Sequence, residues 1–443
     1  MSTSTTLLLS ETIWLCPRPL ARCPGRFPLI PLLPEKPAPK PLPCDIWNRI
    51  LEHVFALYNA PGVKSDEAMM LKLGLVRISR AVNAVALPIF YAFIRVSSLS
   101  VLEKLAARLQ AADKSWDSIR RIPYSAPGRW IHALDLEHLR CTSLEGILRL
   151  DAVLNELLPL VPFLTDFVLN QHAVLSRRAF CGFTHRDGVQ NMRCLKGVQL
   201  TTSMRVDEDT FVELLRACTR LEELEIMGTG TDLSELSAPR DDLLDPSPSV
   251  HPLRLPFIRK IVALSMPSSP ALFALLQSPL PALQHLTVTP YDEISIPGTL
   301  IPRFLRVHGP KLTSLHLYTV KRWPTMLFPS PATLLETCPS LRHASLELPL
   351  PILTLSGAEQ HHLEILSIPR PKSDYLGVLE KLLPKLPRLR FVRARDVKWL
   401  RNGMSTKAQQ AGVQGEMLFW KRKLGRRGIQ LLDAEWNPAT EGV

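Results

Sequence analysis

The chain has 443 residues, 46% of them hydrophobic, so it can bury one large core or two to three ordinary ones. Forty prolines against twenty glycines favour many short elements and argue against a few long helices or a continuous antiparallel sheet. The formal net charge is +12, and residues 371–443 hold fifteen Lys and Arg against seven Asp and Glu. This basic segment suits an acidic protein surface or nucleic acid, although a solvated surface explains it as well.

Cysteine usage and hydropathy restrict the cellular setting. The eight cysteines include no Cys-x-x-Cys pair, which argues against a zinc ribbon, a thioredoxin-like motif and a disulfide scaffold. We therefore expect reduced, mostly buried thiols in the cytoplasm or the nucleus. No stretch reaches eighteen consecutive apolar residues, so we expect no transmembrane helix.

Residues 1–41 are rich in proline, and we expect them to form a disordered leader. Their arginines follow the first apolar run instead of preceding it, which argues against a secretory signal. A transit peptide is the alternative, and Glu11 and the prolines count against it.

Residues 42–55, LPCDIWNRILEHVF, predict the first helix of the chain. Pro43 suits a helix start, and Asp45 can cap or complement its positive end. Helical spacing places five apolar residues on one face, namely Ile46, Ile50, Leu51, Val54 and Phe55. Residues 69–96 predict two more short helices, broken near Pro88. Three short helices make a core too small to be very stable alone, so this helix either starts a larger core or docks against a partner.

A linker helix is expected within 97–126, and a short repeat dominates the rest of the chain. The repeat is apolar-x-x-apolar-x-apolar, and successive copies start 22 to 40 residues apart. Its copies are 131–136, 164–169, 195–200, 221–226, 261–266, 283–288, 312–317, 341–346, 363–368, 389–394 and, as a plausible eleventh, 429–434. Helical periodicity precedes several copies, so each unit predicts a helix, a turn and a short strand.

This pattern resembles the leucine-rich repeat family in its longer, cysteine-containing variety, because Cys218 and Cys338 stand three residues ahead of the first leucine of their copies. The ninth position of the copies varies, so no continuous asparagine ladder is predicted. The resemblance implies an irregular α/β solenoid over 127–436, with parallel strands on the concave side and helices on the convex side. Stacked units would share one core that a single unit cannot bury. Residues 228–256 predict a flexible insertion, and 437–443 a tail.

Side chains alternate along each predicted strand, so the residues between the apolar positions should face out on the concave side. These residues form the candidate substrate-binding surface, and they are Glu223, Glu225, His285, Thr287, His316, Tyr318, His343, Glu347, Phe391, Arg393 and Arg395. The set is acidic near the middle of the chain and basic toward its end. Each residue taken singly is equally an ordinary solvated side chain.

Motifs for catalysis or for cofactor binding are missing from the sequence, which contains no G-x-G-x-x-G, no P-loop, no G-x-S-x-G and no H-E-x-x-H. His361, His362 and Glu364 lack a further metal ligand nearby in sequence. We therefore expect a binding protein that is not an enzyme, with no metal and no cofactor.

Residues 41–96 resemble the F-box. Leu42–Pro43 match its opening Leu-Pro, Ile46 and Ile50 its next apolar positions, and 78–80 (Ile-Ser-Arg) its Val-Ser/Cys-Arg/Lys segment. The run ALPIFY (86–91) is similar to an ending common in fungal F-box proteins. The resemblance implies a substrate-recognition adaptor of an SCF-type ubiquitin ligase, in which the F-box binds a Skp-family adaptor and thereby a cullin, and the repeats bind the substrate. The implied Skp contacts are Leu42, Pro43, Ile46, Ile50, Ile78 and Arg80, for each of which intramolecular packing is the alternative.

Two other functions stay open. One is a repeat scaffold without ligase coupling. The other is a nuclear protein that binds acidic partners or nucleic acid through the basic run 421–427 (KRKLGRR). That run also fits the polar end of an amphipathic helix that packs Leu418, Phe419 and Leu424 onto the last repeat. We expect neither nucleic acid nor a membrane as the main partner.

Overall fold

The computed structural model describes most of the chain from residue 42 onward. The described ranges are 42–58, 65–114, 126–141, 143–171, 173–200, 209–228, 251–266, 269–290, 300–320, 330–356, 360–399 and 412–439. The predicted leader and all but the ends of the predicted insertion 228–256 lie outside them. Contacts divide the chain into two units, Met1–Ile50 and Leu51–Val443. In the described ranges, no helix is long and apolar enough to cross a membrane.

Three helices open the described chain, α2 (Cys44–Tyr58), α3 (Ser65–Val76) and α4 (Arg80–Ala92). The last two divide at 77–79, because the Ser79 hydroxyl accepts a hydrogen bond from the Val82 amide at 3.1 Å and caps α4. The break predicted near Pro88 is wrong, since Pro88 lies inside α4. The carbonyl that residue 88 would normally bond belongs to Ala84, which is exposed to solvent.

A small core joins these helices within the second unit. Leu51, Phe55, Val76 and Ala86 are buried together, and half-buried side chains such as Val82 pack against them. Full burial of a leucine, phenylalanine or valine side chain contributes about 1.5–3 kcal/mol, and alanine contributes less. Four such residues therefore make a modest core.

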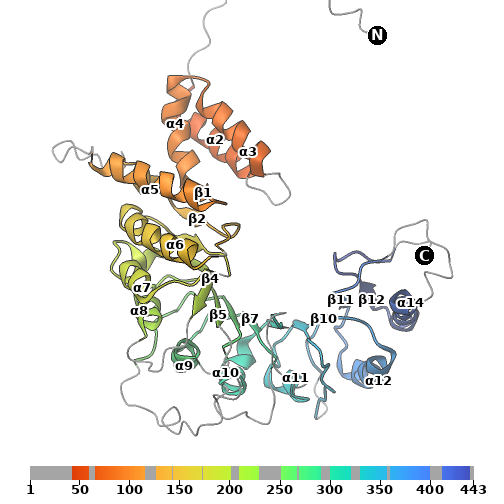
Figure 1. Cartoon of the computed structure of the whole chain (residues 1–443). Helices are drawn as coiled ribbons and strands as arrows, with labels where there is room; N and C mark the ends of the chain where they lie inside the picture. The colour runs from red at the N-terminus through yellow and green to blue at the C-terminus, as the bar shows by residue number, and fades with distance from the viewer. Residues whose placement is uncertain are drawn as a thin grey trace, which may run out of the picture. The chain divides into compact units, whose positions relative to one another are not determined.

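Twelve parallel strands form one sheet in chain order (Figure 1). They are β1 (Phe93–Arg95), β2 (Ala133–Asp135), β3 (Asp166–Val168), β4 (Cys194–Leu200), β5 (Glu223–Gly228), β6 (Lys260–Leu264), β7 (His285–Val288), β8 (Ser314–Leu317), β9 (His343–Ser345), β10 (Ile365–Ile368), β11 (Phe391–Ala394) and β12 (Gln430–Leu432). Each strand pairs only with its neighbours in sequence, which is the arrangement of a solenoid.

Helices run between the strands and lie along one face of the sheet (Figure 1). The α-helices are α5 (Leu99–Lys114), α6 (Leu144–Leu157), α7 (Arg177–Thr184), α8 (Thr210–Ala217), α9 (Pro270–Leu276), α10 (Ile301–His308), α11 (Leu334–Thr337), α12 (Ser373–Leu382) and α14 (Gly412–Gly425). Short 3-10 helices are η2 (Pro127–Trp130), η3 (Leu158–Leu160), η4 (Val189–Asn191), η7 (Gly309–Lys311) and η8 (Leu383–Lys385). The predicted α/β fold of leucine-rich-repeat type is therefore confirmed.

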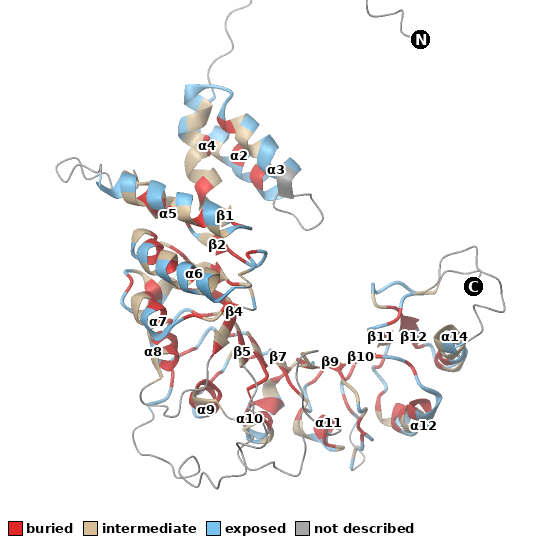
Figure 2. Cartoon of the chain, in the orientation of Figure 1, coloured by how far each residue is buried: buried red, intermediate tan, exposed pale blue. Residues whose placement is uncertain are grey.

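The fourth position of the repeat supplies a continuous ladder of buried side chains, which Figure 2 shows as buried segments along the sheet. Strand pairing aligns the ladder residue by residue, and each member from β2 to β12 is at most 3% exposed. The members are Leu134, Phe167, Leu195, Leu224, Ile261, Leu286, Leu315, Ala344, Leu366, Val392 and Leu431. One core thus runs through all the repeats.

The sheet begins one strand earlier than the repeat predicts. Strand β1 (Phe93–Arg95) lies in the segment assigned to the F-box-like module at 42–96, and it pairs in register with β2. The interval between these strands holds α5, which begins at Leu99 within the predicted linker 97–126. Within the second unit, α4 is therefore followed directly by the first strand of the sheet.

Three predicted copies have the wrong register. Ile261 pairs with Leu224 and Leu286, so it occupies the fourth position of its copy and not the first. Leu195 pairs with Phe167 and Leu224, so it occupies the fourth position of its copy and not the first. The pairing of β4 with β5 shifts between Leu195 and Val198, which forms a bulge. Gly197 lies in this bulge with φ +71°. Only glycine fits there, because a Cβ would lie 2.0 Å from the Leu169 carbonyl oxygen. In the eleventh copy, Leu431 and not Leu432 joins the buried ladder, which is a shift of one residue.

The six described cysteines are free. Cys218 and Cys338 are fully buried, and burial raises the pKa of each thiol to about 12. Burial likewise raises the pKa of Cys194 to about 11. Cys44 is exposed, so the prediction of buried thiols holds for only part of the set.

Candidate functional site

The residues that resemble Skp contacts are all exposed. Leu42 and Pro43 precede α2, Ile46 and Ile50 lie in α2, and the remaining two, Ile78 and Arg80, lie around the Ser79 cap. The four apolar ones among them retain between 41% and 65% of their accessible surface.

The apolar face predicted for α2 divides into two. Leu51 and Phe55 enter the small core, whereas Ile46 and Ile50 remain exposed together with Leu57. At about 100° per residue, Ile46, Ile50 and Leu57 fall within about 40° of one another, on a stripe well away from the buried pair. Scattered exposed apolar residues are ordinary, but an aligned stripe indicates a surface for another molecule.

The predicted concave residues lie on the sheet face opposite the buried ladder, in two rows that strand pairing defines. The first row from β5 to β11 is Glu223, Lys260, His285, Ser314, His343, Ile365 and Phe391. The second row is Glu225, Val262, Thr287, His316, Ser345, Ser367 and Arg393. Tyr318, Glu347 and Arg395 follow the ends of β8, β9 and β11. We call these two rows, with the three residues after them, the exposed sheet face.

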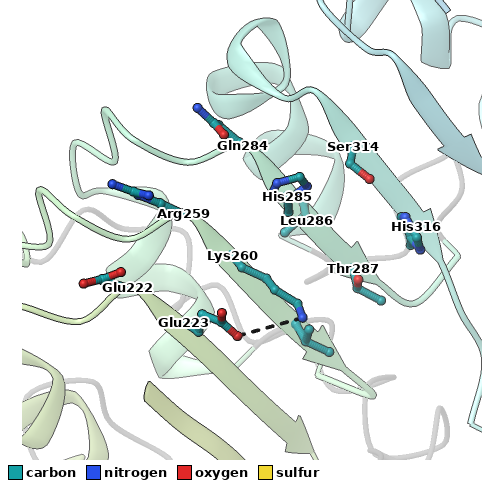
Figure 3. Close-up of a pocket in the computed structure, with 11 residues that line it drawn as sticks. Glu222, Glu223, Arg259, Lys260, Gln284, His285, Leu286, Thr287, Ser314 and His316 are labelled. Carbon is teal, nitrogen blue, oxygen red and sulfur yellow. Dashed lines mark ion pairs between the residues drawn. The ribbon is translucent and has the colours of Figure 1, made fainter. Parts of the chain in front are cut away.

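A depression of about 680 Å³ lies on this face over β5–β8 (Figure 3). The Glu223 carboxylate at one side is 2.7 Å from the Lys196 Nζ and 3.9 Å from the Lys260 Nζ. The hydrogen bond from Lys196 holds the pKa of Glu223 below its usual value. His285 and His316 line the other side of the depression.

A cluster of aromatic rings and a guanidinium continues the exposed sheet face toward β12. The rings of His316 and His343 lie 4.6 Å apart, and that of His343 lies 6.0 Å from Trp436. The Arg393 guanidinium stacks on Trp436 at 4.2 Å from the ring centre and donates to the Ala434 carbonyl at 2.5 Å. These residues come from four repeats, which only the solenoid brings together.

Trp436 was not predicted as a site residue. It lies in the turn after β12, where the Asp433 carboxylate accepts hydrogen bonds from the Glu435 and Asn437 amides, both at 2.9 Å. This turn gives Trp436 a φ of +66°, which is rare for a bulky residue. The sequence signal was the Asp-x-x-x-Asn spacing, which fits an Asx-type turn.

Arg395 connects three repeats. It donates to the Leu317 carbonyl at 3.3 Å, to the Ser345 hydroxyl at 3.0 Å and to the Glu347 carboxylate at 2.6 Å. The Arg395 and Glu347 side chains are 19% and 14% exposed. The two charges therefore largely neutralise each other. Arg393 remains as the unpaired cation that the described residues place at this end of the exposed sheet face.

The two central histidines are neutral near pH 7. Burial lowers the pKa of His316 to about 4, and the Arg395, His285, Arg393 and Lys260 charges act in the same direction. Burial also lowers the pKa of His343 to about 4, with His316 next in importance. The His343 Nε2 lies 2.9 Å from the Ser367 hydroxyl.

Metal-ligating residues do not gather anywhere in the described ranges, where no group of three His, Cys, Asp or Glu is placed to hold an ion. His361 lies in the connection before β10 and is buried. Its Nε2 donates to the Cys338 carbonyl at 3.0 Å, and its Nδ1 accepts from the Leu363 amide at 3.1 Å. Its role is to join two neighbouring repeats.

The basic run 421–427 begins inside α14 (Gly412–Gly425) and ends in the turn after it. Met417, Trp420 and Leu424 form the buried side of the helix. The expectation that Phe419 packs inward is wrong, because it is 45% exposed. A step of three residues from Met417 reaches Trp420, and a further step of four reaches Leu424, so helical spacing passes over Phe419.

Comparison with known proteins adds little to these observations. No protein-family model matches the chain, and no curated protein matches it. The crystal structure of the Rad7 and Elc1 complex in yeast matches over 89% of this chain and 93% of that chain, at 11% sequence identity and a TM-score of 0.27. That TM-score is too low to support a shared function, so the sequence and the contacts described above are what define the candidate site.

Proposed function

We propose that the chain is a substrate-recognition adaptor of an SCF-type ubiquitin ligase. In this proposal α2 docks a Skp-family adaptor, which links the chain to a cullin, and the exposed sheet face binds the substrate protein. The observation that carries the proposal is the exposed stripe of Ile46, Ile50 and Leu57 on α2, whose other side holds Leu51 and Phe55 in a small core.

The energetics favour a partner on this stripe. Removing a large apolar side chain fully from water contributes about 1.5–3 kcal/mol, and the exposed isoleucines of α2 have roughly half of that still to gain. The core beneath α2 is small, so a partner that binds only the folded helices also stabilises them by mass action. Ile78 and Arg80 are exposed as well and are proposed to contribute to the same partner.

The protein is proposed to perform no bond chemistry of its own. Holding a substrate beside a ligase raises the local concentration of its lysines near the conjugating enzyme. The exposed sheet face suits the substrate side of this task, because a solenoid presents one continuous surface built from many repeats.

Co-purification of the full chain with a Skp-family protein tests the proposal. Ile46→Lys combined with Ile50→Lys should abolish recovery of the Skp-family protein, because both lysines would have to be buried in the interface. Ala56→Lys is the matched control, since Ala56 is exposed on α2 about 80° from the stripe. Equal recovery with all three chains would refute the adaptor proposal, and recovery without a cullin would indicate a scaffold that lacks ligase coupling.

A further inference from the structure

The exposed sheet face changes character along its first row. From β6 to β11 the row reads Lys260, His285, Ser314, His343, Ile365 and Phe391, that is, cationic, then polar, then apolar. The second row ends at Arg393, beside the stacked Trp436. A ligand that crosses the strands from β6 to β11 would therefore contact Lys260 first. It would end on the apolar side chains of Ile365 and Phe391, beside the second cation, Arg393.

Both cations keep charge available for a ligand. Lys260 has an ion-pair contact only to Glu223 in the described chain, at 3.9 Å, and that carboxylate is already bonded to Lys196 at 2.7 Å. Arg393 forms no ion pair of 4.0 Å or less within the described ranges, although the Asp433 charge acts on it, and its guanidinium lies on the face against Trp436. The two rows hold no Asp or Glu from β6 to β11, and Glu347 beside them is neutralised by Arg395. The face is thus complementary to negative charge.

Spacing distinguishes among anionic ligands. Lys260 on β6 and Arg393 on β11 are five strands apart, which is about 24 Å at the usual strand separation. An extended peptide covers that distance with about seven residues. A single phosphate would reach one cation only, whereas carboxylates distributed along a peptide reach both and cross the histidines that lie between them.

We propose that the exposed sheet face from Lys260 to Arg393 binds an extended acidic segment of a partner protein, whose carboxylates lie over Lys260 and the histidines and whose final apolar residue packs on Ile365 and Phe391. Trp436 forms the end wall of this site, because its turn holds it beside Arg393 and His343. This proposal specifies what the exposed sheet face would bind in the proposed adaptor. It rests on the adaptor function only in that the bound partner is called a substrate.

Fluorescence anisotropy with purified full chain tests this site. The probe is a labelled nine-residue peptide of seven Asp and Glu residues followed by Leu-Phe, and its control carries Asn and Gln in place of the acids. Lys260→Glu and Arg393→Glu should each weaken binding of the acidic probe about tenfold or more, because they place a negative charge under it. The neutral probe should bind at least tenfold more weakly than the acidic one.

Arg303→Glu is the matched control, since it makes the same charge change at an exposed position on α10, away from the exposed sheet face. Unchanged affinity in the two face variants, or equal affinity for the neutral probe, would overturn the proposal. Tighter binding of a single-stranded oligonucleotide of equal charge would overturn it in favour of nucleic acid. Lys260→Gln and Arg393→Gln give smaller losses in the same direction if the reversals disturb folding.

Skp-family binding by the same variants separates the two proposals. Both should bind a Skp-family protein as the unaltered chain does, because neither residue lies in α2–α4. If the acidic probe binds but a Skp-family protein does not, the acidic-segment site stands and the adaptor function fails. If only the Skp-family protein binds, the reverse holds.

Discussion

The pair formed by Arg395 and Glu347 allows a quantitative test of how the repeats are held together. Three chains are compared with the unaltered one, carrying Arg395→Met, Glu347→Gln or both changes. Arg395 donates to a carboxylate, a hydroxyl and a backbone carbonyl from two earlier repeats, so Arg395→Met removes three bonds and leaves Glu347 without its cation.

The magnitude follows from burial. Hydrogen bonds to charged groups contribute about 1.5–3 kcal/mol, and exposed ion pairs only about 0–1 kcal/mol. With side chains 19% and 14% exposed, the pair lies between a surface and a buried bridge. We expect Arg395→Met to cost about 2–3 kcal/mol and the double-mutant cycle to give a coupling energy of about 1–2 kcal/mol.

Native-state hydrogen exchange followed by mass spectrometry is the assay, on peptides that cover β9 and β11. It reports local opening, whereas a solenoid need not unfold in one cooperative step. A coupling energy below about 0.5 kcal/mol would mean that the two residues act independently, and would refute the conclusion that their ion pair holds the repeats together.

Three further predictions concern backbone, pH and thiols. Gly197→Ala should destabilise the region around β4 by about 2 kcal/mol or more, because residue 197 has φ +71° and the added Cβ would lie 2.0 Å from the Leu169 carbonyl oxygen. Hydrogen exchange measures this loss, and protection equal to that of the unaltered chain would contradict the bulge. Lowering the pH from 6.5 to 4 should destabilise the fold by about 1 kcal/mol for each of His316 and His343 after allowance for partial exposure. Their folded pKa of about 4 lies below the value of 6.5, so the unfolded chain binds more protons in that interval; replacing both by Gln should flatten the profile, and an unaltered profile would argue against buried neutral rings. Iodoacetamide should modify exposed Cys44 before buried Cys338, whose pKa is raised to about 12, and the opposite order by peptide mapping would contradict the burial.

The repeat could be predicted from sequence because burial imposes a fixed spacing on each strand. That spacing does not determine register where the backbone departs from regular pairing. The hexad that begins at Leu195 starts three residues too late, because Gly197 occupies the sixth position of the true copy and interrupts the apolar pattern. The hexad that begins at Ile261 is also three residues late, because Ile258, Ile261 and Ala263 fit the same pattern. In the last copy the apolar pattern favours Leu432, because Gly428 and Asp433 would fill the first and sixth positions around Leu431; only the pairing with β11 identifies Leu431.

The site was predictable to the extent that it follows strand alternation. All eleven residues predicted for the binding surface lie on the exposed sheet face. Trp436 could not be identified in this way, because it lies in a turn beyond the last strand and reaches the face through a positive φ. Nor does alternation show that Arg395 is paired internally while Arg393 is not, since that depends on contacts across repeats.

The sequence also could not show which apolar residues of α2 are buried and which are exposed. Five apolar residues at helical spacing predict a single apolar face, but the small core accommodates only Leu51 and Phe55 fully. The start of α4 depends on the Ser79 cap, whereas the sequence analysis placed the break between the two helices near Pro88. In both cases local spacing is ambiguous until the neighbouring helices are in place.

The most direct test of the adaptor function is the affinity of the purified chain for a purified Skp-family adaptor, measured by isothermal titration calorimetry. The account predicts saturable one-to-one binding that Ile46→Lys with Ile50→Lys weakens at least a hundredfold, about 2.7 kcal/mol, and that Ala56→Lys leaves unchanged. No heat of binding with the unaltered chain, or equal affinity for all three chains, would contradict it.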